Sequence, residues 1–217
     1  MRKLITLLLA AMFTQVAVAQ VAVKGGLNFA NMVFEDDEDD IQDLAKNGNA
    51  GLTGGLAFII PFGDVIALQP EILYTQKGSE LNYTILGEDY YEKVRYNYID
   101  IPILLRLSLG GTYGEGLGLY LNGGVYAGYA LNGKKEQNVP ILGMQESDIS
   151  FDDQDREGRV DFGAVGGVGL SLGDLFLELR YMHGINNLLD NDADNSNDVG
   201  FNKLQHRGLG LTAGWVF

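Results

Sequence analysis

The sequence predicts an all-β fold, an eight-stranded antiparallel up-and-down transmembrane β-barrel. Three observations predict it. Apolar residues alternate with small or polar ones over eight separate segments, which is the pattern of strands. The connections between these segments are alternately short and long, as in the hairpins of an outer-membrane barrel. The charges inside the segments all share one parity, so that only one face of the barrel wall carries charge.

Residues 1–19 are predicted to be a cleaved signal peptide, which leaves 20–217 as one barrel domain. A positive start is followed by an apolar stretch over Leu4–Phe13 and a small-x-small site at Ala17–Ala19. This stretch is too short for a membrane-spanning helix, although a buried N-terminal helix is an alternative. The chain has no cysteine, which excludes a lipidated cysteine anchor and a disulfide framework.

The composition is acidic, with a formal net charge of −14. Removing the two basic residues of the signal peptide leaves 13 basic against 29 acidic residues, a net charge of −16. Such a chain is not expected to bind nucleic acid, since that affinity comes from neutralised phosphates. After residue 20, no stretch approaches the roughly 18 apolar residues of a membrane helix. We therefore expect a barrel exported to the outer membrane of a Gram-negative bacterium.

The first four strands follow the signal peptide in order. Valine and leucine alternate with alanine, lysine and glycine in the first, and leucine, phenylalanine and isoleucine with glycine and alanine in the second. The third sets isoleucine, leucine and tyrosine against glutamine, glutamate, threonine and lysine. The fourth sets isoleucine and leucine against aspartate, proline and arginine. These strands are predicted over residues 21–29, 51–60, 65–77 and 98–107.

The last four strands repeat the pattern with more glycine on the less apolar parity. The fifth and sixth alternate leucine, valine and aromatics with glycine, and the seventh alternates leucine with glutamate and arginine. The eighth, "GLGLTAGWVF", ends the given sequence. These strands are predicted over residues 117–131, 160–172, 175–185 and 208–217. Long polar loops are expected over residues 31–50, 79–93, 132–158 and 187–202.

Eight charged residues lie inside these strands, on the parity expected to face the lumen. On the lipid side each charge would cost about 2–4 kcal/mol. A soluble lipocalin-like barrel would invert the pattern, and a soluble β-sandwich is the remaining alternative. We predict a structural network of salt bridges that fills the narrow lumen, with Glu71 and Asp100 sharing Arg106 and Arg180; a gated ion path is the functional alternative. The set is Lys24, Glu71, Lys77, Asp100, Arg106, Asp161, Glu178 and Arg180.

The ends of the strands carry outward aromatics, as in the girdles at the two membrane interfaces. Phe29, Tyr74, Tyr129 and Tyr181 lie at the expected outer end, and Phe58, Trp215 and Phe217 at the inner end. The last strand must pair with Val21–Ala30 to remove both sheet edges. Trp215 and Phe217 are also predicted to be the assembly signal read by the barrel-assembly machinery.

Five blocks of the sequence carry a family resemblance. They are "VKGGLNFANM", "ALQPEILYTQKG", "YNYIDIPILLRL", "LYLNGGVYAGYAL" and "FGAVGGVGLSLGDLFLELRYMHGINNL". In their order and spacing they resemble the PorT-like outer-membrane β-barrel family over nearly the whole mature chain. The resemblance implies an eight-stranded outer-membrane barrel, most of whose relatives have no assigned activity. PorT itself is linked to the type IX secretion apparatus, but no residue here carries that role over.

The expected outer loops hold 22 of the 29 acidic residues. Solvated loop charge explains most such runs, but hard cations also favour several oxygen ligands. "DNDADNSND" resembles the first half of a calcium loop, yet Asn195 and Phe201 stand where that motif needs Gly and Glu. Weakly bound Ca²⁺ or Mg²⁺ bridging to lipopolysaccharide phosphates is the broader expectation. The candidate cation contacts are Glu35, Asp36, Asp37, Asp190, Asp192 and Asp194.

An enzyme is not expected. The two histidines, His183 and His206, are expected on the outer rim. Ser196 and Asp198 in the adjoining loop would supply the other residue types of a catalytic triad, but nothing in the sequence specifies their geometry. No nucleophile motif or oxyanion-hole signature accompanies them. Two functions remain open: a monomeric envelope-structural or surface-binding barrel, with "VPILGM" in loop 132–158 as the best protein contact, and a narrow transport pore. A secretion-system partner is a further possibility.

Overall fold

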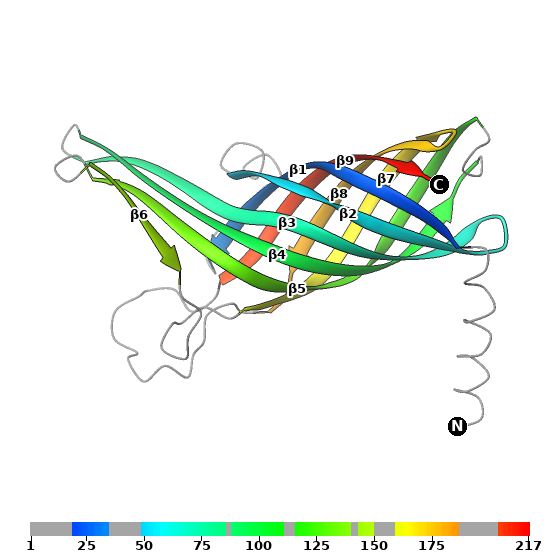
Figure 1. Cartoon of the computed structure of the whole chain (residues 1–217), viewed down its shortest axis with the longest axis horizontal. Helices are drawn as coiled ribbons and strands as arrows, with labels where there is room; N and C mark the ends of the chain where they lie inside the picture. The colour runs from blue at the N-terminus through cyan, green and yellow to red at the C-terminus, as the bar shows by residue number, and fades with distance from the viewer. Residues whose placement is uncertain are drawn as a thin grey trace, which may run out of the picture.

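The computed structural model describes residues 19–34, 49–85, 88–110, 116–139, 143–149, 159–186 and 204–217. They form one sheet of nine antiparallel strands (Figure 1). The strands are β1 (Gln20–Phe34), β2 (Asn49–Phe62), β3 (Ile66–Ile85), β4 (Glu88–Ser108), β5 (Leu117–Val139), β6 (Gly143–Ile149), β7 (Val160–Leu172), β8 (Leu175–Gly184) and β9 (Leu204–Val216). No helix in these ranges is long and apolar enough to cross a bilayer.

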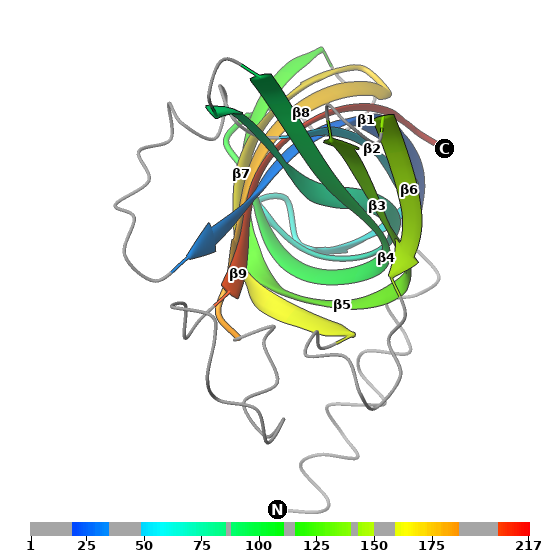
Figure 2. The ribbon, with the colours of Figure 1, turned by 90° about the vertical axis from the view of Figure 1, so that its left-hand side faces the viewer.

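Eight of the strands close into a ring, which confirms the predicted barrel. Each of them pairs with its neighbours in the chain, except that β5 pairs with β7 and β1 pairs with β9 (Figure 2). The last seam is completed by Phe217, whose backbone N–H donates to the carbonyl of Val21 at 2.8 Å. A closed ring leaves no unpaired sheet edge, so the backbone polar groups of the wall are satisfied without water.

Short turns lie at one end of the ring, here called the turn end. Gly63 connects β2 to β3 with φ of 84°, and Gly173 connects β7 to β8 with φ of 57°. Both values lie in the left-handed region, where a side chain is strained, so glycine fits both turns. The opposite end is called the loop end.

The strands are longer at the loop end than the sequence pattern predicts, and the prediction of loops at 79–93 and 132–158 is wrong in part. β3 and β4 stay paired from Ile66↔Leu107 up to Ile85↔Glu88, and β5 continues to Val139. A ninth strand, β6, then pairs with Gly133–Val139 of β5. Residues 78–85, 88–97, 132–139 and 143–149 thus form a sheet beyond the ring, called the protruding sheet, visible at the left of Figure 1.

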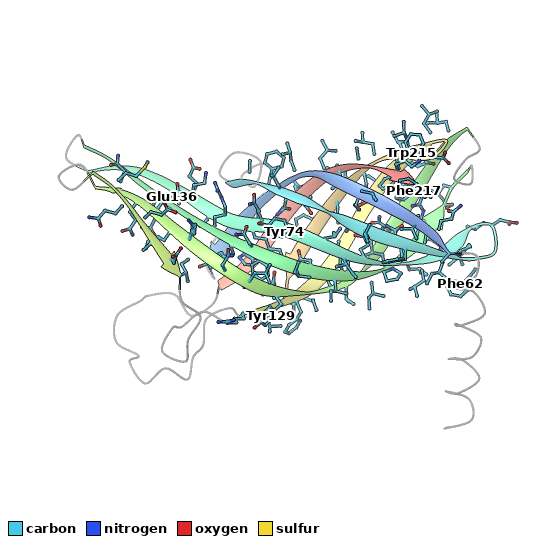
Figure 3. All side chains as sticks on the ribbon, in the orientation of Figure 1. Phe62, Tyr74, Tyr129, Glu136, Trp215 and Phe217 are labelled. Carbon is cyan, nitrogen blue, oxygen red and sulfur yellow. The ribbon has the colours of Figure 1, made fainter. Side chains whose placement is uncertain are left out.

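The outer face of the ring is apolar. Leucine, isoleucine and valine side chains with exposed fractions near one half occur along every strand of the ring, as the alternation requires. Tyr74 and Tyr129 lie nearer the loop end, while Phe62, Trp215 and Phe217 gather at the turn end (Figure 3). This distribution matches two interfacial aromatic belts around an apolar band.

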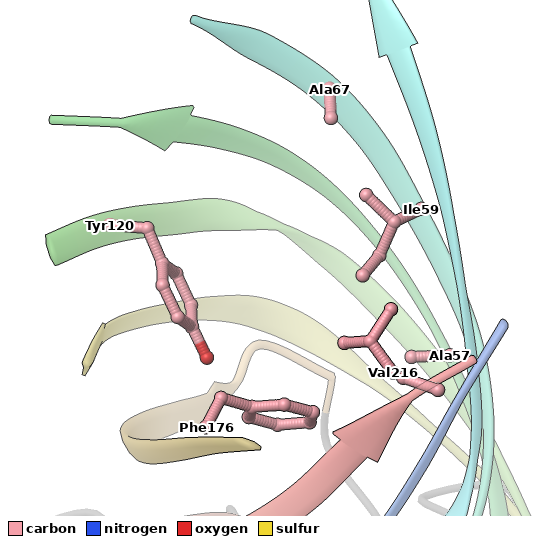
Figure 4. Close-up of a cluster of buried hydrophobic side chains, with 7 residues drawn as sticks. Ala57, Ile59, Ala67, Tyr120, Phe176 and Val216 are labelled. Atoms are coloured by element: carbon pink, nitrogen blue, oxygen red, sulfur yellow. The ribbon is translucent and has the colours of Figure 1, made fainter. Parts of the chain in front are cut away.

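The inner face is packed in successive layers along the barrel axis. At the turn end lies an apolar cluster of Ala22, Ala57, Ile59, Ala67, Tyr120, Phe176 and Val216 (Figure 4). A charged layer follows, then the apolar residues Leu104, Tyr126, Val165 and Met182, then a second charged layer. Tyr96, Tyr98 and Ala130 close the loop end, with Val94 and Ile149 packed against them. An eight-stranded ring is just wide enough to be filled this way.

Candidate functional site: the lumen and the protruding sheet

All eight charged residues expected in the lumen are buried there, each with at most 5% of its surface exposed. They divide into two groups, which we call the inner network and the outer network. The inner network contains Lys24, Glu71, Arg106, Glu178 and Arg180, and the outer network contains Lys77, Asp100 and Asp161. The side chains of each strand point alternately into and out of the lumen. Several strands therefore contribute inward charged residues to the two networks.

The inner network is centred on two carboxylates that share two cations. Arg180 donates from Nη1 to Oε2 of Glu71 at 2.7 Å and from Nη2 to Oε1 at 2.9 Å. Its Nη2 also lies 2.7 Å from Oε1 of Glu178, and Lys24 donates to the same oxygen at 2.7 Å. Asn122 donates to the other oxygen of Glu178 at 2.6 Å. Buried charges are stable only when paired and hydrogen-bonded in this way.

Arg106 lies at the turn-end side of the inner network. Its guanidinium carbon is 3.4 Å from the ring centre of Tyr120, and its Nη1 donates to Oε1 of Gln69 at 3.2 Å. Gln69 in turn donates to Oε1 of Glu71 at 2.6 Å. Stacking on an aromatic face and fork-shaped donation are the two interactions that distinguish arginine from lysine.

The outer network is centred on Lys77, and its pairing differs from the prediction. Lys77 donates to Asp100 and to Asp161, both at 2.9 Å, and lies over the rings of Tyr98 and Tyr126. The expectation that Asp100 shares arginine partners with Glu71 is therefore wrong, because an apolar layer separates the two carboxylates along the barrel. Glu71 does bond to Arg180 as expected.

His206 is a member of the outer network that sequence reasoning missed. It was expected on the rim, but only 3% of its surface is exposed, and its Nδ1 lies 3.2 Å from Oδ2 of Asp161. The rings of Tyr96 and Tyr98 meet it edge-on. The alternation of the strand does predict an inward position for His206, because His206 has the same parity as the inward-facing Gly208 and Gly210 on that strand.

The two histidines lie on opposite faces of the wall. His183 is partly exposed and approaches the hydroxyl of Tyr181 on the outer parity of β8, whereas His206 faces the lumen. They therefore cannot contribute to one reaction centre. Ser196 and Asp198, the other residues of the hypothetical catalytic triad, lie outside the described residues.

The described part of the lumen holds a small cavity between the two networks. The cavity between the two networks, bordered by Lys24, Thr75 and Met182, measures about 20 Å³. That is enough for about one water molecule. A second cavity, of about 290 Å³, opens at the turn end beside Arg106. Arg106, one of its lining residues, belongs to the inner network.

The protruding sheet differs from the ring in its exposure. Every described side chain of β6 except Ile149 is exposed, and Met144 is 72% exposed. Cross-strand ion pairs cover its surface: Lys134 with Glu146, Lys135 with Glu92, and Lys93 with Glu80. The Lys134 hydrogen bond to Glu146 lowers the pKa of that carboxyl below its ordinary value of 4.5. Ile149 alone connects β6 to the apolar cluster of the loop end.

Several expected sites cannot be placed. The candidate cation contacts Glu35, Asp36, Asp37, Asp190, Asp192 and Asp194 lie outside the described residues. Within the described ranges, no group of three or more histidine, aspartate or glutamate side chains is arranged to hold a metal ion. The predicted signal peptide also falls outside them, except for its last residue. Trp215 and Phe217 do lie on the outer face of the wall, at the turn end (Figure 3).

Solved structures of three bacterial proteins are similar to this chain over most of its length. Neisserial surface protein A aligns with a TM-score of 0.45 and 11% identity, covering 92% of this chain and 99% of that one. The attachment invasion locus protein Ail of Yersinia pestis, solved in complex with the heparin analogue sucrose octasulfate, gives 0.42 and 11%, with the same two coverages. OprG of Pseudomonas aeruginosa gives 0.44 and 11%, covering 92% and 96%.

No curated protein matches the chain at a significant level. A family profile does match it, over residues 13–190, and that family is described as the outer membrane protein beta-barrel domain. The match spans β1 to β8 of the ring, and β9 completes the closed wall, apolar outside and charged inside, that such a domain requires. The chain belongs to the outer membrane protein beta-barrel domain family.

Proposed function

We propose that the protein is a non-enzymatic, monomeric surface-binding barrel: the plugged ring anchors it in the outer membrane, and the protruding sheet binds an extended segment of another protein. The observation that carries this proposal is the exposed outer edge of β6, which pairs with no other strand among the described residues. By the convention of such barrels, the short turns mark the periplasmic side. The loop end, and with it the protruding sheet, then faces the exterior.

The ring supports the role of an anchor. Two salt-bridge networks and three apolar layers fill the lumen, and the described cavity between the networks has room for about one water. The packing argues against the narrow transport pore as an alternative. In planar bilayers, the purified chain should show no steady open state; a reproducible unitary conductance would contradict the plugged barrel.

The protruding sheet supports the role of a binding surface. The outer edge of β6 pairs with no described strand, and neither does the β3 edge beyond Gln76. Such edges have a row of backbone donors and acceptors ready to pair with an added strand. Native sheets usually cover or shorten an edge of this kind, so its persistence at the exposed end of a rigid barrel favours a binding role.

Charge indicates the chemistry of the partner. The four segments of the protruding sheet contain seven acidic and four basic residues, and β6 itself has Glu146 and Asp148 with no basic residue. An added strand with lysine or arginine on its outward parity would be attracted, and an acidic strand repelled. We therefore propose a basic, extended polypeptide segment as the partner.

A designed peptide that alternates lysine with threonine tests this proposal. Its binding to the refolded chain in nanodiscs should be saturable and should weaken with salt. A variant with Gly143–Ile149 replaced by a Gly-Ser stretch of equal length should lose the binding, while Glu146→Lys with Asp148→Lys should shift preference towards an alternating glutamate–threonine peptide. Unchanged binding by the Gly-Ser variant would contradict the role of the β6 edge.

We propose three further points about the natural partner and the route to the membrane. The resemblance to PorT-like barrels supports a component of a secretion apparatus, which cross-linking from β6 in intact cells would identify. The acidic loops support Ca²⁺ or Mg²⁺ bridging to lipopolysaccharide of a Gram-negative membrane. Export by a signal peptide cleaved before Gln20, and recognition of Trp215 and Phe217 by the assembly machinery, complete the expected route to the membrane.

A further inference from the structure

We propose that one water molecule is bound inside the lumen beside the seam between β1 and β9, where it bridges both of these strands and β8. A cavity of about 20 Å³ lies there, which is enough for one water molecule. Its walls include Asn28 of β1, Thr212 of β9 and Arg180 of β8. This water site concerns how the ring is closed and does not depend on what the protruding sheet binds.

The cavity is opened by Gly210, which pairs with Asn28 on one side and with Arg180 on the other. All three residues share the inward parity of their strands. The backbones of Asn28 and Arg180 are separated by two strand spacings, roughly 10 Å, and Gly210 places no side chain between them. Thr212 is the next inward residue of β9, so its side chain borders the same space.

Three buried polar atoms of this cavity's lining residues have no hydrogen-bond partner among the described residues: Oδ1 of Asn28, Nε of Arg180 and Oγ1 of Thr212. All three residues are at most 6% exposed. Asn28 donates from Nδ2 to the carbonyl of Gln76 at 3.0 Å, which fixes the orientation of its amide group. Because buried polar atoms are nearly always paired, these three atoms indicate a bound ligand.

The chemistry of the three atoms matches water. Nε–H of Arg180 is a donor, Oδ1 of Asn28 is an acceptor, and the hydroxyl of Thr212 can be either. One water can accept from Arg180, donate to Asn28 and form a third bond with Thr212, and about three bonds are usual for a buried water. A cation would be repelled by Lys24 and Arg180, which border the cavity, and an anion would face the carbonyl oxygen of Asn28.

The position of the site gives the water a role in closing the ring. Backbone pairs join β1 and β9 from Ala22↔Val216 to Phe34↔Leu204, and Asn28 lies near the middle of this seam. The water adds a side-chain connection across the seam, from Asn28 to Thr212. It also connects both strands to Arg180, whose terminal nitrogens bond to Glu71. The closing seam is thereby attached to the inner network.

The experiment uses the full mature chain, isotope-labelled and refolded in nanodiscs, with water itself as the probe. NMR cross peaks at the water frequency should appear on the Nε–H proton of Arg180 and on the α protons of Gly210. In the rotating frame these peaks should be opposite in sign to the diagonal, which marks contact through space rather than proton exchange. The methyl groups of Leu104, which is buried in the apolar layer, should show none. Absence of the Arg180 and Gly210 peaks would overturn the proposal.

A variant and a matched control locate the water. Gly210→Ala should displace it without a clash, because the nearest atoms to the added methyl group lie at 3.9 and 4.0 Å, and the water peak on Arg180 should disappear. Gly25→Ala should keep this peak, since Gly25 lies on the outer face of the same seam and its methyl group would be 3.8 Å from the nearest atom. A peak that persists in folded Gly210→Ala would come from the hydroxyl of Thr212 and would refute the site.

Hydrogen exchange of the seam amides gives a second test with a definite sign. In a barrel without the water, Gly210→Ala would slow exchange, because alanine restricts the unfolded chain and its methyl group adds contacts. Displacing a bound water instead leaves the buried atoms of Asn28 and Arg180 unpaired. Exchange along the β1–β9 seam should therefore be several-fold faster in Gly210→Ala than in Gly25→Ala. Slower exchange in Gly210→Ala would contradict the bound water.

Discussion

The lumen and the protruding sheet are built from the same strands but stabilised in opposite ways. Inside the ring, β3 and β4 hold charges that are almost fully buried and share partners within networks. Beyond the ring, β3, β4 and β5 hold partly or fully exposed charges in cross-strand pairs, such as Lys134 with Glu146. The difference shows that context, rather than residue type, decides whether an ion pair is structural.

Neutralising a carboxylate at the centre of the inner network should give the largest effect. Glu178→Gln leaves Lys24 and Arg180 with half of their shared negative charge, and we expect a loss of about 3–5 kcal/mol of unfolding free energy. Urea unfolding in lipid vesicles measures it. The matched change in the protruding sheet, Glu146→Gln, should leave the unfolding midpoint unchanged. An equal loss of unfolding free energy at the two positions would contradict the view that buried and exposed ion pairs contribute differently to stability.

Close packing inside the ring should give the next effect. A methyl group at Gly169 would overlap the ring of Tyr120, which bonds to Glu178 and supports Arg106. Gly169→Ala should therefore cost about 1–3 kcal/mol. Gly166→Ala is the control, since the nearest atom to its added methyl is an Asn122 carbonyl oxygen at 3.8 Å. A stable Gly169→Ala barrel would indicate a looser lumen than described.

The two histidines should respond differently. His206→Ala removes a buried hydrogen bond to Asp161 and should cost about 1 kcal/mol. His183→Ala, on the outer face of the wall, should cost nothing measurable in the same urea titration. The reverse order of effects would place His206 outside the network.

Deleting Phe217 should cost a barrel that is already folded about 1 kcal/mol or less, because it removes one backbone hydrogen bond, to Val21, and a side chain that is 75% exposed. In cells, however, the amount of inserted barrel should fall several-fold, as expected for an assembly signal. Heat-modifiable gel mobility of outer-membrane fractions measures this amount. The Gly-Ser replacement of β6 is the matched control and should insert normally. Normal insertion of the truncated chain would contradict the signal.

The smallest expected effect is the pH dependence of the exposed ion pair between Lys134 and Glu146. Because Lys134 lowers the pKa of Glu146 below 4.5, the pair is fully formed at higher pH and is lost as the pH falls through the lowered value. Amide signals of β6 should therefore shift on acidification below about pH 4.5, while Lys134→Gln should remove the part of the shift due to the pair. Shifts that Lys134→Gln leaves unchanged would assign them to another group.

Much of the ring could be predicted because lipid on one side and a narrow lumen on the other leave few choices. Period-two alternation placed Lys24, Glu71 and Glu178 on the inner face, where the structure has them. The partner of Asp100 could not be predicted, because which strand positions share a height depends on the stagger of the barrel, and no single strand reports it. Lys77 lies 23 residues away from Asp100 and meets it only through that stagger.

The protruding sheet could not be predicted, because its signal weakens where lipid ends. Beyond the membrane, both faces of a strand meet water, and over Gly78–Ile85 the apolar residues Leu81, Tyr83 and Ile85 fall on the parity that carries Lys77 rather than on the lipid-facing one, so the pattern of the membrane wall does not continue. Polar residues there look like a loop, and only pairing with β4 makes them a strand. His206 was misjudged for another reason: the eighth strand was predicted to begin at Gly208, which left His206 beyond its outer end, whereas β9 begins at Leu204.

The continuity of β3, β4 and β5 also has a mechanical consequence. β4 alone has 21 residues, or about 70 Å at about 3.3 Å per residue, and runs unbroken from the protruding sheet to the turn end. A partner that pulls on β6 along the strands loads in shear the ladder that joins β6 to Gly133–Val139 of β5, so that its backbone hydrogen bonds share the load instead of peeling apart singly. The long wall beneath then serves as the anchor, and the length of the β5–β6 ladder sets how strongly the barrel can hold a partner.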